Sequence, residues 1–335
     1  MELTKRKQNI LASIVDGYIR TGEPVGSKSI AEKAGVSSAT VRNEMAELTE
    51  LGLLEQPHTS AGRVPSQEGY REFVDALMQP KTLTEAEKLT IDAMLAKSAF
   101  DPERLLRGAA KTLAASTRYL ALSTTKIKAV QFVQTSRRTA MLIMMSSAGT
   151  MKNKVFHCDF DLSNEIMRIF FRVLNERVTG RDVAEINRAF VQNLAISLGN
   201  MAILMSPALA ALLEVALETM QTEISVSGQM NLLFYPEYKL GGARRVMDIL
   251  ERRELLTELL AGKQNRTQIK IGTETGQNAL AESSVICARY SVNGRDAGAV
   301  AVIGPMRMQY AHVAAQTAYV ADRVGEMLTR IMREE

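Results

Sequence analysis

Residues 23–63 constrain the fold of this chain more than any other stretch, because they follow the pattern of a helix-turn-helix with a β-wing. Two short helical patterns flank a turn at 35–37, where glycine supplies the tight geometry. Ser37 is suited to cap the second helix, which is expected over 38–51. A polar hairpin rich in turn residues follows at 57–63. Proteins built this way place the second helix in the major groove of DNA, so sequence-directed DNA binding is the leading hypothesis.

The second predicted helix separates its side chains onto two faces. Val41, Met45 and Leu48 recur at helical spacing and are expected to face the core. On the opposite face, Arg can read guanine, Asn can read adenine, and small Ala side chains permit close approach to bases. The helix start suits a phosphate. The alternative is an ordinary solvated helix face. The predicted DNA-contacting residues of this helix are Ser37, Ser38, Ala39, Thr40, Arg42, Asn43 and Ala46.

The hairpin is the second predicted contact element. Gly62 is expected to give its tip conformational freedom. Arg63 is expected to reach a phosphate or the minor groove, where arginine is favoured. His58, Thr59 and Ser60 would add neutral hydrogen-bonding groups. An ordinary polar hairpin without a DNA contact is the alternative.

The charge distribution gives DNA binding no general support. The chain carries 41 Lys/Arg and 37 Asp/Glu, a net charge of +4. Residues 1–80, however, hold nine Lys/Arg and eleven Asp/Glu, a net charge of −2. Support for DNA binding therefore has to come from the direction in which particular side chains point.

The composition is that of a cytoplasmic protein of two or three domains. The length is 335 residues, of which 46% are hydrophobic. The two cysteines, Cys158 and Cys287, provide neither a disulfide framework nor a zinc site, which favours a reducing compartment. No secretory signal is expected at the N-terminus. The uncharged stretch 192–213 is too polar and interrupted for a membrane span, so a soluble protein is predicted.

No catalytic constellation emerges, and we predict neither a cofactor nor a metal site. Residues 157–159 (His-Cys-Asp) invite a metal or nucleophile interpretation, but a structural role is favoured because no second cysteine is near. The loop 272–276 has glycines at both ends but lacks the lysine and spacing of a P-loop. Arg307 is expected to anchor a loop. An enzyme is therefore not expected.

The remaining periodicity predicts an α+β arrangement in which two groups of short strands flank a mainly helical block. One α+β domain interrupted by a helical insertion explains this order most simply. Helices are expected over 4–20, 28–34, 68–78, 84–97, 102–116, 162–175, 182–198, 208–223, 241–260 and 310–332. Strands are expected over 129–134, 140–146, 151–156, 230–234, 268–271, 284–291 and 298–303, with a hairpin turn at Asn293-Gly294.

Three segments, 22–28, 36–45 and 56–65, together resemble the N-terminal domain of the HrcA family, the bacterial heat-inducible transcription repressors. Residues 69–75 extend the resemblance, and 303–310 resemble the late signature of that family. The resemblance implies an α+β multidomain fold with a winged helix-turn-helix and a GAF-like domain that contains an inserted, mainly helical dimerisation domain. The expected bounds are 1–80 for the winged helix, 81–119 for a helical linker, 120–178 and 237–335 for the GAF-like domain, and 179–236 for the insertion.

The resemblance also implies a function: repression of chaperone operons through an inverted-repeat operator, the CIRCE element, with activity maintained by chaperonin. An inverted repeat requires a two-fold symmetric reader, so a homodimer is expected. The predicted interface residues, for which plain domain core is the alternative, are Met201, Ile203, Leu204, Met205, Leu209, Leu212 and Leu213. A ligand-sensing regulator with an effector pocket in the GAF-like domain is the second hypothesis.

Overall fold

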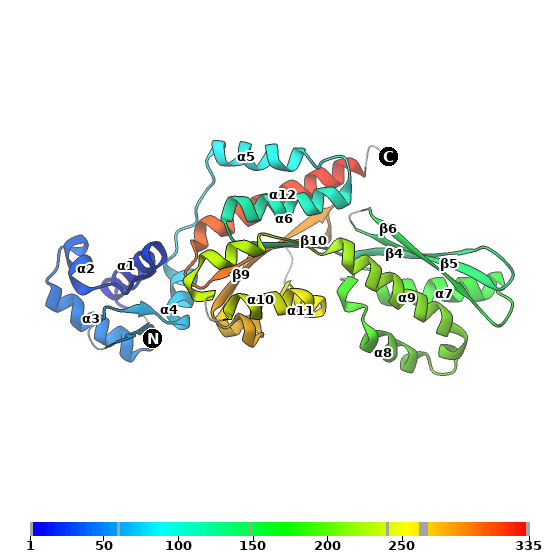
Figure 1. Cartoon of the computed structure of the whole chain (residues 1–335), viewed down its shortest axis with the longest axis horizontal. Coiled ribbons are helices and arrows are strands. Elements are labelled where there is room, and N and C mark those ends of the chain that lie inside the picture. The colour runs from blue at the N-terminus through cyan, green and yellow to red at the C-terminus, as the bar shows by residue number, and fades with distance from the viewer. Residues whose placement is uncertain are drawn as a thin grey trace.

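The computed structural model describes residues 3–58, 61–147, 149–181, 183–238, 241–260 and 267–332. The molecule is elongated and has three parts in a row (Figure 1). An N-terminal helical unit with a small wing occupies one end, a five-stranded sheet with helices on both sides lies in the middle, and a lobe of strands and helices forms the other end.

Three helices and a two-stranded wing form the N-terminal unit. Its core is built from successive turns of the first and third helices, including Ile14, Val15 and Leu48. The wing is short because only two residues of each strand pair, Leu54 with Pro65 and Glu55 with Val64. The elements are α1 (Lys5–Thr21), α2 (Ser27–Ala34), α3 (Ser38–Glu50), β1 (Leu54–Glu55) and β2 (Val64–Pro65).

Helical segments then lead from the wing to the central sheet. The helix expected over 68–78 is present as an α-helix that continues into a π-helix. In α5 the Thr84 side chain and Glu87 form a complete capping box, which fixes where that helix begins. These elements are α4 (Gln67–Glu72), η1 (Phe73–Leu77), α5 (Glu85–Ala96) and α6 (Pro102–Thr117).

The central sheet is antiparallel, with strand order β7-β3-β10-β9-β8. The hairpin between its two longest strands turns at Asn293-Gly294, where both residues have positive φ (51° and 74°), which confirms the predicted turn. The strands are β3 (Leu120–Thr125), β7 (Ser225–Ser227), β8 (Gln268–Ile271), β9 (Ser283–Val292) and β10 (Arg295–Pro305).

Both faces of this sheet are covered, and side chains of β10 alternate between two cores. Val300 and Val302 point to the core shared with α6, α12 and the N-terminal unit, whereas Ala301 and Ile303 point to the core shared with the far lobe. Helices cover the sheet above and below in Figure 1. The further elements here are η3 (Gln229–Phe234), η4 (Pro236–Tyr238), α10 (Gly242–Glu251), α11 (Arg253–Leu260), η5 (Gly272–Thr275), η6 (Asn278–Leu280) and α12 (Tyr310–Ile331).

The far lobe is a three-stranded antiparallel meander covered by helices, and it is inserted between β3 and β7 of the central sheet. Its strands pair only with one another in the order β4-β5-β6. Its elements are β4 (Ile127–Gln134), β5 (Thr139–Ser146), β6 (Met151–His157), α7 (Asn164–Val178), η2 (Val183–Glu185), α8 (Arg188–Leu198) and α9 (Met201–Glu223).

One strand was wrongly expected, and another was missed. The strand expected at 230–234 is the 3-10 helix η3, and β3 was not expected at all. All six residues of β3 are buried, so its sequence lacks the alternation that reveals a half-exposed strand. The helix expected over 208–223 is longer than expected, because α9 begins at Met201 and continues through Pro207.

Among the described residues one helix, α9, is long and apolar enough to cross a membrane by length and composition alone. It is 39% buried over its most apolar window, Met201–Thr219, and its inner side packs on β5 and β6. A helix that covers a sheet in this way has the same composition as a membrane span without requiring a membrane.

Candidate nucleic-acid interface

The third helix is fixed at its start by hydroxyl groups. Ser37 caps α3, its Oγ accepting from the backbone N–H of Thr40 at 3.0 Å, as predicted. The Oγ atoms of Ser27 and Ser38 lie 2.9 Å apart and join the start of α2 to the start of α3. Gly35 supplies the left-handed turn (φ 63°) between these helices. The two helices therefore meet at a tight, polar corner.

The two predicted faces of α3 are present. Val41, Met45 and Leu48 are buried in the core of the N-terminal unit. Ser37, Ala39, Arg42, Asn43 and Ala46 are exposed, while Ser38 and Thr40 are half-buried. Within the described residues Arg42 makes no intramolecular ion pair, so its guanidinium is available to an outside partner. The exposed face combines one arginine, one asparagine and two alanines, which is suited to the edges of bases.

Two carboxylates on α3 are matched by cations from α1. Glu44 lies 3.6 Å from Arg6 and 3.9 Å from Lys7, and Glu47 lies 2.7 Å from Lys7. The hydrogen bond to Glu47 raises the pKa of Lys7, against the effect of desolvation. These pairs reduce the negative charge near the exposed face of α3. Sequence reasoning missed Arg6 and Lys7 because the pairs join elements about 40 residues apart.

The wing lies against the loop that precedes α2, and two of its residues make contacts that the sequence did not indicate, while the DNA contact expected of Arg63 stays a prediction. A Cβ atom on Gly62 would lie 2.3 Å from the Val25 carbonyl oxygen, so glycine permits close backbone approach here and does not serve the tip. Arg63 exchanges two backbone hydrogen bonds of 2.9 Å with Val25, and its Nε donates to Thr49 Oγ1 at 3.0 Å. Arg63 therefore ties the base of the wing to the end of α3.

The tip of the wing is described only in part. His58 is exposed, and its carbonyl accepts from the N–H of Ala61 at 2.9 Å. Thr59 and Ser60 lie outside the described residues. The predicted contact through His58, Thr59 and Ser60 stays a prediction.

Comparison with known proteins agrees with this geometry in both halves of the chain. Residues 2–77 match the model of the winged helix-turn-helix transcription repressor, HrcA DNA-binding, and residues 103–314 match that of the HrcA protein C terminal domain. The chain belongs to the HrcA family. Its similarity to individual members extends over the whole length, as two heat-inducible transcription repressors HrcA show.

The relative from Acetivibrio thermocellus is 31% identical over 347 residues, covering 100% of this chain and 99% of the relative. The relative from Pelotomaculum thermopropionicum is 33% identical, covering 99% of both. A solved crystal structure described as a hypothetical protein shares the fold, with a TM-score of 0.63, 24% identity and coverage of 98% of this chain and 100% of the other. The HrcA family consists of DNA-binding transcription repressors, so the protein is a regulator of transcription.

In this HrcA-family chain the DNA-binding unit is joined to the central sheet by polar contacts from α4. Arg71 bonds both carboxylate oxygens of Glu274, at 2.9 and 2.5 Å, and the carbonyl of Ile269 at 2.7 Å. Gln67 accepts from the N–H of Thr273 at 2.8 Å. We call these contacts the α4–η5 clamp. The glycine-rich loop 272–276 therefore holds the DNA-binding unit by side chains and backbone, in agreement with the loop interpretation.

A second junction surrounds the late HrcA signature. Arg307 forms an ion pair with Glu237 and lies 5.8 Å from the ring centroid of Tyr235. Its guanidinium also approaches Gly22 at the end of α1. The ring centroids of Tyr70 and Tyr310 lie 5.9 Å apart and connect the α4 segment to α12. Arg307 thus anchors a loop, as predicted, and the position of α3 relative to the sheet depends on several contacts.

The predicted interface residues of the far lobe fall on two faces of α9. Met205, Leu209 and Leu212 are buried in the core, and Leu213 is half-buried. Met201, Ile203 and Leu204 are exposed by 36%, 77% and 45%, and Ile196 of α8 is exposed by 78%. We call these four exposed side chains the α8–α9 apolar surface. The buried residues stabilise the lobe and are not accessible to a second chain.

Residues 157–159 fit the structural role that the sequence suggested. Cys158 is fully buried, and burial, aided by Asp159, raises the pKa of its thiol, which disfavours the reactive thiolate. His157 Nδ1 lies 3.2 Å from Thr139 Oγ1 on the neighbouring strand. Among the residues that the structure describes, no three His, Cys, Asp or Glu side chains gather as a metal site.

Proposed function

We propose that this chain represses chaperone operons by binding an inverted-repeat operator of the CIRCE type as a homodimer. The observation that carries the proposal is the exposed face of α3, where Arg42 and Asn43 stand between small alanines. A protein that acts on DNA in this way works in the cytoplasm.

Operator binding is tested by the fluorescence anisotropy of a labelled inverted-repeat duplex against an unrelated duplex of equal length over a salt series. Specific binding predicts a preference that persists as salt rises, because base contacts add to the salt-sensitive phosphate contacts. Equal, salt-steep binding to both duplexes would contradict sequence-directed recognition.

The proposed dimer is supported by the α8–α9 apolar surface. Two aliphatic side chains more than three-quarters exposed, Ile196 and Ile203, lie on α8 and α9, which pack against each other in the far lobe. Contiguous exposed apolar side chains often mark the sites where soluble proteins bind partners. A two-fold pair formed there would leave both winged helices free for the two halves of an operator.

We propose a domain organisation that follows the path of the chain through the central sheet. The chain leaves that sheet after β3 at 125 and returns at β7 at 225. The inserted unit then spans about 126–224, wider than the 179–236 expected from sequence. The sheet with its helices on both faces would be the GAF-like domain, formed by 120–125 and 225–332.

Control by chaperonin is proposed from the family resemblance, and exposed apolar side chains support it, since chaperonin captures such surfaces. Adding chaperonin and ATP to the anisotropy assay should raise the active fraction of repressor. No change in the active fraction at saturating chaperonin would contradict this part of the proposal. A ligand-sensing GAF-like pocket stays the alternative, and ligand-dependent thermal stabilisation across a metabolite panel would favour it.

A further inference from the structure

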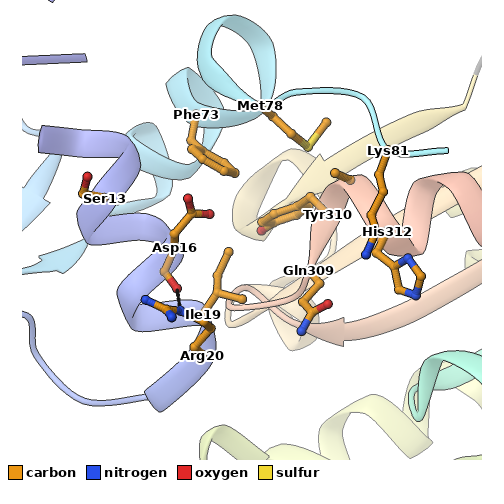
Figure 2. A pocket seen from close by; sticks show the side chains of 11 residues that line it. Ser13, Asp16, Ile19, Arg20, Phe73, Met78, Lys81, Gln309, Tyr310 and His312 are labelled. Carbon is orange, nitrogen blue, oxygen red and sulfur yellow. Dashed lines mark hydrogen bonds between the residues drawn. The ribbon is translucent and has the colours of Figure 1, made fainter. Parts of the chain in front are cut away.

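A cavity of about 510 Å³ lies where the DNA-binding unit meets the central domain (Figure 2). One wall is the exposed side of α1, and the opposite wall is the first turn of α12. The segment that follows η1 closes the top, with Met78 and then Lys81. Cavities of this size at domain boundaries commonly hold small molecules.

The charged groups that line the cavity come from two elements, α1 and the segment after η1. Arg20 lies on α1, where its Nε donates to the Asp16 carbonyl at 3.2 Å, and Lys81 lies on the segment after η1. Neither cation has an ion pair within the described residues. The Asp16 carboxylate also lines the cavity. Two cations therefore line the cavity together with one carboxylate, and a second carboxylate, Glu87, lies beside His312 and interacts electrostatically with Lys81.

His312 adds a neutral polar group to the same wall. Its Nε2 lies 3.3 Å from Glu87, and its Nδ1 is buried without a hydrogen-bond partner in the structure. Burial, followed by the charge of Lys81, lowers the pKa of His312 although Glu87 opposes the shift. The shift favours the neutral form of the imidazole. No side chain caps the start of α12, whose N–H groups favour negative charge nearby.

The rest of the lining is apolar and partly aromatic. Ile19 comes from α1, Phe73 and Met78 from the η1 segment, and the Tyr310 ring from α12. The Tyr310 hydroxyl lies 2.8 Å from Ser284 Oγ and is therefore already hydrogen-bonded. The part of Tyr310 that remains available to a ligand is its ring. A ligand that suits this lining has an apolar body beside an anionic group.

We propose that this cavity binds a small organic anion, a carboxylate or phosphate ester attached to an apolar group. Lys81 and Arg20 would hold the anionic group, and the Phe73, Met78 and Tyr310 side chains would cover the apolar part. Because the walls belong to both units, an occupied cavity favours the arrangement seen here over one in which the winged helix has swung away. The ligand would thereby set the position of α3 relative to the central domain.

Binding is tested by titration calorimetry of the full chain with phenyl phosphate, phenylacetate and inorganic phosphate. We expect saturable binding of at least one aromatic anion, tighter than that of inorganic phosphate, because only the aromatic probes reach the apolar wall. Comparing the two aromatic probes distinguishes a phosphate from a carboxylate site. Absence of saturable binding for both aromatic probes would overturn the proposal.

Three variants locate the binding. Lys81→Gln should weaken it about tenfold or more, since a charge-assisted hydrogen bond is lost. Ala311→Leu fills the cavity without altering its charge and should abolish binding. Lys97→Gln removes an exposed cation at the C-cap of α5, outside the cavity, and should change nothing. Equal affinities in all three variants would show that the anion binds elsewhere and overturn the assignment.

The link to α3 is tested separately, with DNA. Adding the best aromatic anion should change operator affinity in the unaltered chain and leave the Ala311→Leu variant unaffected. Because calorimetry needs no DNA, an incorrect operator assignment cannot be mistaken for an empty cavity. Binding of the anion without a change in operator affinity would overturn the coupling.

Discussion

Arg42 is the single residue on which sequence preference should depend most. It is exposed on α3 and makes no intramolecular ion pair in the described part of the chain. Arg42→Ala should cost about 1–3 kcal/mol of binding free energy at one base pair in each half-site. Anisotropy titrations against a panel of single-base operator variants measure this. Glu50→Gln, at the exposed end of the same helix, is the control. A loss spread evenly over all duplexes would show that Arg42 contacts phosphate instead.

Gly62 offers a test of how the wing is seated. A Cβ atom there would meet the Val25 carbonyl oxygen at 2.3 Å, whereas one on Gly26 would meet nothing within 4 Å. Gly62→Ser should therefore lower the free energy of unfolding by about 1–3 kcal/mol and weaken operator binding. Gly26→Ser should be neutral, because serine suits the N-cap of α2. Urea unfolding of both variants measures their free energies of unfolding. Equal values would contradict the close approach of Gly62 to the Val25 carbonyl.

At the scale of elements, the α4–η5 clamp should set the direction in which α3 is presented. A double-mutant cycle of Arg71→Ala and Glu274→Ala should give a coupling of about 1 kcal/mol, because the pair is partly buried and bidentate. Breaking it should weaken binding to a full inverted repeat more than to a single half-site. Asp75→Ala, which removes the other carboxylate partner of Arg71, is the control. Equal losses on both duplexes would argue against an orienting role.

A second element-scale prediction concerns the point where the far lobe leaves the central sheet. Burial raises the pKa of Asp296, but hydrogen bonds from Arg289 and Lys126 outweigh it, and the pKa lies below its ordinary 3.8. A lowered folded-state pKa means stability that is present above about pH 4 and lost as the pH falls through the folded pKa. Asp296→Asn should lower the free energy of unfolding at pH 7 by about 1.5–3 kcal/mol. The stability of the variant should also fall less as the pH is lowered, on the acid limb of its stability curve.

Thermal unfolding from pH 3 to pH 7 checks this, with the exposed Asp159→Asn as the control. An Asp296→Asn variant with an unchanged acid limb would show that the ion pairs of Asp296 do not contribute to acid stability.

The elements also show what sequence could predict. The faces of α3 and the Asn293-Gly294 turn follow from local periodicity and turn chemistry, and both are present. β3 could not be found, because a strand buried on both faces has no alternating pattern. The role of Arg63 and the partnership of Arg71 with Glu274, 203 positions away, depend on tertiary packing that periodicity does not encode. The cavity was missed for the same reason.

For the whole molecule, the α8–α9 apolar surface predicts the route to a dimer. Ile203→Glu places a charge where a second copy would bury an aliphatic side chain, and it should convert the dimer to a monomer. Leu89→Glu, at a residue 67% exposed on α5, is the matched control and should stay dimeric. Light scattering over a concentration series gives the mass. If the Ile203→Glu variant remains a dimer, the interface lies elsewhere on the molecule.

The central claim is that two copies of α3 read the two halves of one operator. The most direct measurement is the stoichiometry and affinity of the full chain on an intact inverted repeat and on a duplex with one half-site scrambled. The account predicts two chains per intact duplex and a large loss of affinity when either half is scrambled. One chain per duplex, with affinity unaffected by scrambling one half, would contradict it.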